Sequence, residues 1–581
     1  MKKFILGILL IAVFGVLAAC GSVEVPNQGA GQNQTPQNQQ GGTQPPGGTT
    51  QTPPPGSGPD SINWNEHETF TWFMLGTPPN DYFTDYAEEP IANYLMNRFN
   101  VTFEFQQPIS GTESDALALM MGSGRYTDAI NLAVYQGSVS QLHDDGIIID
   151  IAEWLDYMPN FRRWLETDPD FNRIARDDQG RILCLPNIAD EPVNTYSGLV
   201  YRHDILETMT GGNVQFPSGN NVPTTIADWE YMLPLFLEYF RGAGFADYAP
   251  LILPSNGVIH FGELMNSFGS YYHFYVRNDT VYSGILQPQF YNYVETMRRW
   301  YENGWIHQDF ASRTGEMFFR PNPPLVFGGA AGAWYGMGIH LGDQMSMPEF
   351  GMNFDVRPAP SPMAEGVTHR DMLRRGEDLY GSSRGNAIST SNHNIGKFLA
   401  VIDHLYSEEG GMLRGVGLSA DQVTDDSVMH RMGMSEGAHW FDDAGNVVFH
   451  PNIDTAGGHI IISALVGVRF NGFAFKSFEN SMREERVAHA DAMWTAQDSV
   501  TEVHPLPGQL SPTSEEAAIL ATNEPRINDI RDQRLVRFII GSDPLTPDTW
   551  AAFLDELRAL GIEENLAIHQ AAYDRFLVRG Q

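Results

Sequence analysis

The first part of the folded chain alternates between strand-like and helix-like segments, and this alternation restricts the fold more than any other feature. Residues 67–75 (HETFTWFML), 101–105 (VTFEF) and 128–134 (DAINLAV) are short runs rich in β-forming residues. Between them, residues 88–100 and 113–124 carry apolar residues as helices do. Strands that alternate with helices predict a largely parallel sheet, in which ligands bind at the loops that follow the strands.

Two acidic turns mark predicted hairpins further along the chain. Residues 171–186 are expected to turn at Asp177–Gly180, and residues 439–451 repeat the pattern at Asp442–Gly445. Aspartate before glycine is common turn chemistry, so we interpret both acidic pairs as structural and not as metal ligands or acid–base groups. Helical patterns follow at 223–240 and at several later segments; Pro234 is expected to break or kink the first of these helices.

The N-terminus has the pattern of a bacterial lipoprotein signal. Lys2 and Lys3 precede an apolar run that ends at Ala19 and is shorter than the ~20 residues of a membrane-spanning helix. Leu17-Ala18-Ala19-Cys20 fits the lipobox, in which the cysteine thiol receives a diacylglyceryl group after cleavage. We predict a signal peptide over residues 1–19 and lipidation of Cys20; the alternative is an ordinary secretory signal with a chance cysteine.

The next residues are predicted to form a disordered tether over 20–64. They consist mainly of Gly, Gln, Pro, Asn and Thr and hold almost no large apolar side chain. Such a segment cannot bury enough surface to offset its ordering entropy. A flexible chain of ~40 residues reaches on the order of 35 Å, so the tether would let the body stand off a membrane on its extracellular side.

Composition limits the function of the body. Asp and Glu number 71 and Lys and Arg 35, which gives a net charge of −36 and disfavours nucleic acid as a partner. About 520 residues are more than one core normally holds, so two or more lobes are expected. Cys184, the only other cysteine, lies in an apolar run, and we interpret it as a buried inert thiol.

Motifs for catalysis are nearly absent. The chain has no H-E-x-x-H, P-loop, G-x-G-x-x-G or C-x-x-C pattern. Residues 381–385 match G-x-S-x-G formally, but they lack the apolar strand before and the helix after that a nucleophile elbow needs. We therefore predict no catalytic residues, no metal site and no cofactor.

Five segments, in order, carry a resemblance to a known family. They are TWFMLGTPPNDYFTDY (71–86), GLVYRHDIL with PTTIADWEYML (198–233), VETMRRWYENGWIHQDF (294–310), AISTSNHNIGKFLAVIDHLYSEEGGMLRGVGLS (387–419) and RFIIGSDPLTPDTWAAFLDELRALGIEENLAIHQAAYDRF (537–576). The chain resembles extracellular solute-binding protein family 1, and within it the large lipoproteins of oligosaccharide ABC importers of Gram-positive bacteria. The resemblance covers most of residues 65–578. Pro234 and an apparent insertion after residue 422, ahead of Glu436–Trp440, depart from the family pattern.

The resemblance implies a two-lobed, periplasmic-binding-protein-like α/β fold of type II, with mostly parallel sheets, flanking helices and a multi-strand hinge. It implies closure around a ligand and recognition of the closed form by a permease. The expected crossings between lobes are Pro186–Ala189, Phe327–Tyr335 and Ala387–Asn392. The expected lobes are residues 65–187 with 337–388, and residues 188–336 with 389–581.

A carbohydrate site needs aromatic rings that stack on sugar faces and polar groups that bind hydroxyls. Such groups occur at the predicted strand ends and crossings. The candidate ligand-binding residues are Asn80, Asp81, Tyr82, Tyr135, Gln136, Tyr196, Trp334, Tyr335, Glu436 and Trp440. Trp334 is the best single candidate, because a tryptophan near this crossing commonly stacks on a sugar ring in related binding proteins.

The expected function is capture of a carbohydrate, in particular an oligosaccharide, by a lipid-anchored monomer that delivers it to the transmembrane subunits of an ABC permease. Two alternatives remain from the sequence. A cell-surface glycoside hydrolase would need two carboxylates ~5–9 Å apart across a cleft, and 71 acidic residues make chance pairs unavoidable. A peptide-binding protein on the same fold would use aromatic side chains and main-chain hydrogen bonds.

Overall fold

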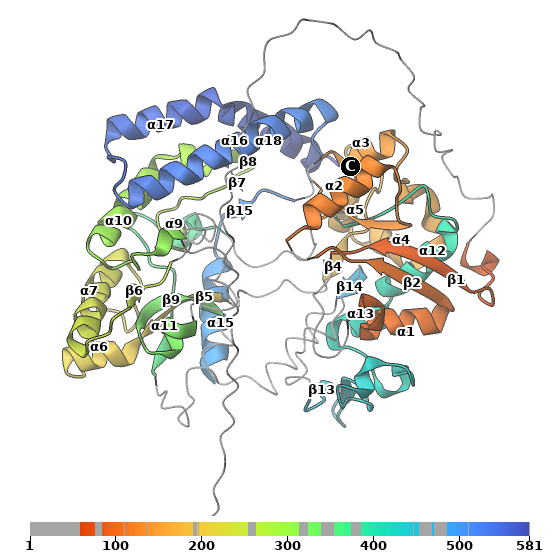
Figure 1. Cartoon of the computed structure of the whole chain (residues 1–581), viewed down its shortest axis with the longest axis horizontal. Helices are drawn as coiled ribbons and strands as arrows, with labels where there is room; N and C mark the ends of the chain where they lie inside the picture. Colours follow the sequence, from red (N-terminus) through yellow and green to blue (C-terminus); the bar gives the residue numbers. More distant parts are fainter. Residues whose placement is uncertain are drawn as a thin grey trace, which may run out of the picture. The chain divides into compact units, whose positions relative to one another are not determined.

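The predicted strand–helix alternation forms the first sheet of the computed structural model (Figure 1). β1 (Glu68–Phe73) pairs in parallel with β2 (Val101–Gln106) and with β3 (Ala129–Asn131). β11 (Asn386–Ile388) adds to β3 in the antiparallel direction, so the strand order is β11-β3-β1-β2. The three strands predicted in this part of the chain are confirmed.

The structure describes the greater part of the folded body. The described residues are 58–75, 84–109, 111–135, 137–189, Thr195, 197–253, 263–312, 323–337, 354–373, 385–445, 447–452, 467–469, 485–508 and 510–579. All of them belong to the unit Gly47–Gln581. The predicted signal peptide and Cys20 lie outside them, as does all but the end of the predicted tether and the whole of the formal G-x-S-x-G match except its last glycine.

Helices cover both faces of the first sheet. On one face Phe70 and Trp72 pack with residues of α1 (Pro90–Phe99) and α12 (Ile395–Asp403). On the other face Phe73 packs with residues of α2 (Glu113–Ser123) and α3 (Val139–Asp144). We call this sheet with its covering helices the first lobe. Its remaining helices are η3 (Ile151–Tyr157), α4 (Pro159–Thr167), α5 (Pro169–Ala175) and α13 (Glu408–Val416).

The second sheet has the order β10-β5-β9-β6, and its pairings are mixed. β5 (Ser197–Arg202) is antiparallel to both β10 (Val356–Ala359) and β9 (Ala331–Met337), whereas β6 (Ala249–Leu251) is parallel to β9. This sheet and its covering helices form the second lobe. Those helices include α6 (His203–Thr210), α7 (Ile226–Ala243), α10 (Pro288–Glu302), α11 (Pro323–Phe327) and α15 (Glu485–Asp498).

The C-terminal helices pack on the second lobe. α16 (Ser514–Ile539), α17 (Pro547–Ala559) and α18 (Ile562–Leu577) follow one another, and α16 contacts α10. Leu535, Phe538 and Phe553 share one apolar core with residues of α7 and α10. Smaller elements complete the fold: α9 (Glu263–Asn266), the sheet β15-β7-β8 (Val503–Pro505, Phe274–Arg277, Thr280–Ser283) and the parallel pair β14-β4 (Gly467–Arg469, Asn187–Ala189).

Two segments lie in a different lobe from the one expected. Residues 356–359, expected in the first lobe, form β10 of the second sheet. Residues 395–418, expected to complete the second lobe, contribute Ile395, Phe398 and Leu418 to the first core. The apolar side chains of these two segments could pack in either core. The sequence pattern of each segment therefore did not show to which lobe it belongs.

Local predictions have mixed outcomes. The hairpin at 439–451 is confirmed as β12 (His439–Phe441) paired with β13 (Val447–Phe449). Residues 171–186 differ: residues 171–175 are helical in α5, and only the turn at Asp177–Gly180 forms, where the Gly180 N–H donates to the Asp177 carbonyl at 3.0 Å. Pro234 does not end α7, and Cys184 is buried as predicted.

Gly198 in β5 allows a close approach of α15. A Cβ atom at this position would lie 2.3 Å from the indole of Trp494, which is fully buried. The Trp494 indole N–H also donates to the carbonyl of Ala359 in β10 at 2.9 Å. A side chain at position 198 would therefore displace the helix from the sheet.

We expect Gly198→Ala to lower the free energy of unfolding by about 1–3 kcal/mol, as overpacked core positions do. The matched control is Gly242→Ala in α7, where an added Cβ meets nothing within 4 Å. There alanine should stabilise by up to about 1 kcal/mol through its helix propensity. Urea unfolding of both variants measures the difference; equal stabilities would contradict the packing described.

Candidate functional site

Five of the ten predicted ligand-binding residues lie outside the described residues. They are Asn80, Asp81, Tyr82, Gln136 and Tyr196. The other five are placed in two groups. Tyr135, Glu436 and Trp440 belong to the first lobe, and Trp334 and Tyr335 belong to β9 of the second lobe.

Trp334 and Tyr335 face opposite sides of the second sheet, as neighbouring strand residues do. Trp334 is 3% exposed and packs with Val200 and Trp494 on the side of α15. Tyr335 is 5% exposed and lies on the side of α7, where its hydroxyl forms a 2.8 Å hydrogen bond with that of Ser197. The two rings therefore do not form one shared binding surface in this structure.

Glu436 and Trp440 lie on one segment of the first lobe. Glu436 is exposed in the turn before β12, and Trp440 in β12 is 43% exposed. A hydrogen bond of 3.0 Å from the Thr424 hydroxyl to the Asn93 side chain links the same part of the chain to α1. Trp440 is thus the most accessible of the predicted aromatic residues that the structure describes.

Tyr135 follows β3 and its ring lies over the backbone of Gly137. A Cβ atom at position 137 would be 2.4 Å from the Tyr135 hydroxyl oxygen and 2.6 Å from the ring carbon that bears it. The ring is therefore held against the loop that leads into α3. Gly137 itself lines a cavity, so Tyr135 stands at the edge of a hollow in the structure.

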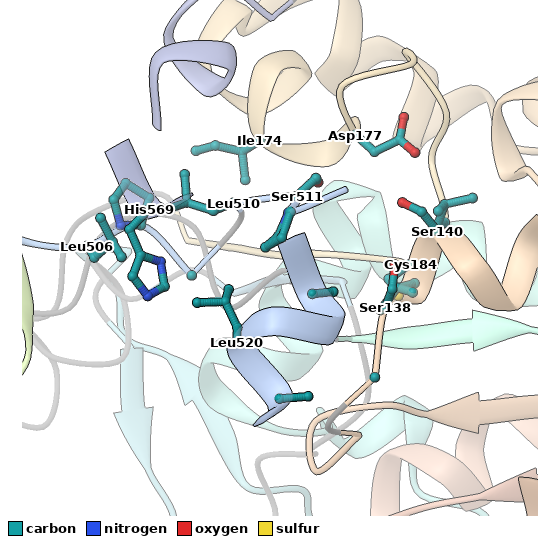
Figure 2. Close-up of a pocket in the computed structure, with 18 of the residues that line it drawn as sticks. Ser138, Ser140, Ile174, Asp177, Cys184, Leu506, Leu510, Ser511, Leu520 and His569 are labelled. Carbon is teal, nitrogen blue, oxygen red and sulfur yellow. The ribbon is translucent and has the colours of Figure 1, made fainter. Parts of the chain in front are cut away.

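This cavity has a volume of about 420 Å³ and lies between the first lobe and the C-terminal segments (Figure 2). Figure 2 shows Leu506, Leu510, Leu520 and His569 on one side and Ser138, Ser140 and Cys184 on the other. The lining residues are Gly137–Ser140, Ile174–Asp177, Leu183, Cys184, Pro186, Leu506–Gly508, Leu510–Pro512, Ala517, Leu520, Ala521, Glu524, Pro525, Asn528 and His569. Among the described residues that line this cavity there is no Phe, Tyr or Trp to stack on a sugar ring.

Charged side chains link the two lobes close to the cavity. The Arg575 and Arg579 guanidinium groups in the C-terminal segment each donate a 2.7 Å hydrogen bond to the carboxylate of Asp178. Sequence reasoning assigned Asp178 only to a turn and assigned nothing to the two arginines. Their spacing of four residues was the available signal, although only Arg575 lies within α18 (Ile562–Leu577) and Arg579 follows its end.

A further hydrogen bond lies where the chain passes from the first lobe to the second. The hydroxyl of Thr195 donates a short hydrogen bond to the Asp498 carboxylate at the end of α15. Ser197, two residues later, begins β5. This crossing residue is therefore fixed to the second lobe before its sheet starts.

The carboxyl groups of Glu89 and Asp403 have a raised pKa, and both have structural roles in the first lobe. Burial raises the pKa of Glu89 to about 7, and its carboxylate caps α1 by accepting the Ala92 N–H at 2.9 Å. Burial also raises the pKa of Asp403, which accepts the backbone N–H groups of Asn160 and Phe161. In the described part of the chain no cluster of three His, Cys, Asp or Glu side chains is arranged to hold a metal ion.

No helix among the described residues is both long and apolar enough to cross a membrane.

Comparison with solved structures identifies the fold. The chain is similar to an HMO-binding ABC-transporter-associated solute-binding protein from Bifidobacterium longum infantis ATCC 15697, with 18% identity and a TM-score of 0.68 over 88% of this chain and 99% of that one. The chain shares the fold of that protein. The predicted α/β fold class is confirmed, while no protein-family model and no curated protein sequence matches the chain.

Two further structures share this fold. Alginate-binding protein AlgQ2 is 16% identical, with a TM-score of 0.65 over 87% of this chain and 98% of that one. The substrate-binding protein FusA of the S. pneumoniae ABC transporter, in complex with kestose, is 19% identical, with a TM-score of 0.64 over 88% of this chain and 99% of that one. At such identities the likeness establishes the fold and not the ligand.

The buried carboxyl of Glu89 predicts a pH effect on stability. Its pKa in the folded protein lies above the usual value of about 4.5, so the folded state holds the proton more tightly than the unfolded chain. The stability that this proton confers is complete below pH 4.5 and is lost as the pH rises through 7. Glutamine has no such proton to lose, so Glu89→Gln should not show this loss of stability. At 1.36 kcal/mol for each pKa unit, the loss in wild type amounts to at most about 3 kcal/mol.

The measurement is urea unfolding of wild type and Glu89→Gln between pH 4.5 and 8. As the pH rises, the free energy of unfolding of Glu89→Gln should increase relative to that of wild type. Glu104→Gln, at an exposed position on β2, is the matched control and should run parallel to wild type. A wild-type curve parallel to that of Glu89→Gln would contradict the prediction.

Proposed function

We propose that the protein is the lipid-anchored substrate-binding component of an ABC importer and that it captures an oligosaccharide between its two lobes. The observation that carries the proposal is the fold, which the chain shares over 87–88% of its length with proteins described as binding HMO, alginate and kestose. These three ligand names describe carbohydrates. Capture by stacking and hydrogen bonding also agrees with a net charge of −36, which disfavours strongly anionic ligands.

The anchor is proposed from the N-terminus. A diacylglyceryl group on Cys20 would hold the mature chain to the outer face of the cell membrane, and residues 20–64 would serve as its tether. A single lipidated cysteine followed by a polar, glycine-rich segment suits a soluble body that has to reach a membrane permease. The partners are then the transmembrane subunits of that permease, and the body acts as a monomer.

The proposed role is binding and not hydrolysis. A glycosidase needs a carboxylic acid with a raised pKa that faces its substrate. Burial raises the pKa of Glu89 and of Asp403, but each of these carboxyls accepts backbone N–H groups within the first lobe. Neither is available to protonate a leaving group.

The ligand site is proposed to draw on both lobes. Tyr135, Glu436 and Trp440 would contribute from the first lobe, together with the loop of Asn80, Asp81 and Tyr82 and with Gln136. Trp334, Tyr335 and Tyr196 would contribute from the second lobe and its crossing segment. Because Trp334 and Tyr335 face opposite sides of β9, they would not contact one ligand from the same face.

The deciding experiment is a titration of the purified protein with neutral oligosaccharides, followed by thermal shift and calorimetry. We expect at least one intact oligosaccharide to raise the unfolding temperature, because a ligand that binds only the folded state stabilises it. Reducing-end release is measured in the same samples, and peptides of similar length serve as the control ligands. Release of reducing ends would establish the hydrolase alternative, and a shift with peptides alone would establish the peptide-binding one.

The role of Trp334 is tested with a pair of matched variants. Trp334→Phe and Trp494→Phe each replace a buried indole of the same apolar cluster with a smaller phenyl ring. Each should therefore lower the free energy of unfolding by about 1–3 kcal/mol. If Trp334 stacks on the sugar, only Trp334→Phe should weaken oligosaccharide binding, by about tenfold or 1.4 kcal/mol. Calorimetry of both variants measures this; equal affinities would remove Trp334 from the site.

A further inference from the structure

Residues 419–445 and 447–452, which include the hairpin β12–β13, form a small module of the first lobe. The Arg431 guanidinium donates to the Glu88 carboxylate at 2.9 Å, and the Gln422 side-chain amide donates to the Glu409 carboxylate at 3.1 Å. These bonds attach the module to the rest of the lobe, so its hairpin has a fixed base. The module also has an apolar core of its own, made by Val428, Met429, Met432, Met434 and Ala438.

The hairpin has an inner and an outer side. On the inner side, His439 is 5% exposed and hydrogen-bonds to the backbone of Val416 at the end of α13. Phe449, opposite His439 in the strand pair, packs against the module core. Neighbouring residues of a strand point to opposite sides, so Trp440 lies on the outer side, where it is 43% exposed.

His450 shares the outer side with Trp440. The centres of the two rings are 6.3 Å apart and their planes are perpendicular. The Nδ1 atom of His450 accepts the backbone N–H of Asn452 at 3.0 Å, so the neutral imidazole carries its proton on Nε2. In the described part of the chain no group accepts a hydrogen bond from this Nε2. We call Trp440 and His450 together the outer corner.

The outer corner has the two groups that recognition of a sugar ring requires. A flat indole stacks on the C–H face of a pyranose, and an N–H donor binds a hydroxyl oxygen at its edge. The surroundings are acidic, because residues 419–452 contain six aspartates and glutamates and a single arginine, which is bound to Glu88. Negative charge at this surface disfavours sugars that carry carboxylate groups.

We propose that the outer corner binds one ring of an uncharged oligosaccharide. The C–H face of the sugar lies against the indole of Trp440, and one hydroxyl oxygen accepts from His450 Nε2. The inference rests on the proposed function and deepens it by a residue, His450, that the sequence did not single out. Both residues belong to one hairpin of the first lobe, so the corner does not depend on Trp334 or Tyr335.

The test is calorimetry of the full chain with kestose, maltotetraose and lacto-N-tetraose as uncharged probes and an alginate tetramer as the anionic probe. At least one uncharged probe should bind, and the alginate tetramer should bind more weakly than that probe. Trp440→Ala should weaken this binding by about tenfold or more, because the stacking surface is lost. Its unfolding temperature should stay close to that of wild type, because the ring is largely exposed.

Two variants test the donor of His450. His450→Gln keeps an N–H donor and should retain an affinity within about threefold of wild type, whereas His450→Leu removes the donor and should lose about tenfold. The matched control is Phe441→Ala. Phe441 is also exposed, at 52%, but follows Trp440 directly in β12 and therefore points to the other side of the hairpin. This control should bind as wild type does.

The outcomes separate the outer corner from the proposed function. If wild type binds an uncharged probe and either Trp440→Ala or His450→Leu binds it equally well, the outer corner is wrong and the proposed function stands. An equal loss in Phe441→Ala would also overturn the outer corner. Tighter binding of the alginate tetramer than of every uncharged probe would overturn the preference for uncharged sugars. Absence of binding for all four probes would contradict both the outer corner and the proposed function.

Discussion

Each of the two central sheets has to be covered on both faces, and most of the architecture follows from this constraint. In the first lobe, α1 and α12 cover the face of Phe70 and Trp72, and α2 and α3 cover the face of Phe73. In the second lobe, α7 and α10 cover one face, and α11 and α15 cover the other. A body of about 520 residues reaches this state with two cores, since a single core of that size would exceed what domains normally build.

The same constraint determines what happens to the large aromatic residues. A tryptophan on a sheet that is covered on both sides becomes part of a core, as Trp72, Trp494 and Trp334 do. A tryptophan on a two-stranded hairpin with one open side stays accessible, as Trp440 does. The proposed sugar site therefore depends on residues at loops and hairpins more than on residues within the central strands.

The sequence predicted local structure better than it predicted lobes. The periodic segments 88–100 and 113–124 became helices, and the β-forming runs beside them became strands, because local packing decides both. The lobe of residues 356–359 and 395–418 depended on which core lay nearest in space, and a single sequence does not contain that information. Residues 171–175 became helical because Phe171 and Ala175, four residues apart, both face the first core. For the ligand site, the sequence predicted the types of residue and the loops. It did not predict the burial of Trp334, because this burial depends on α15, which lies some 150 residues later in the chain.

The hydrogen bond from Thr195 to Asp498 attaches α15 to the segment that crosses between the lobes. Trp494 and Asp498 lie one turn apart on this helix, and they hold Gly198 and Thr195, which lie three residues apart in the chain. The start of β5 is thus in contact with α15 at two places. Because both contacts join the start of β5 to α15, a displacement of Thr195 that keeps these contacts has to carry α15 with it.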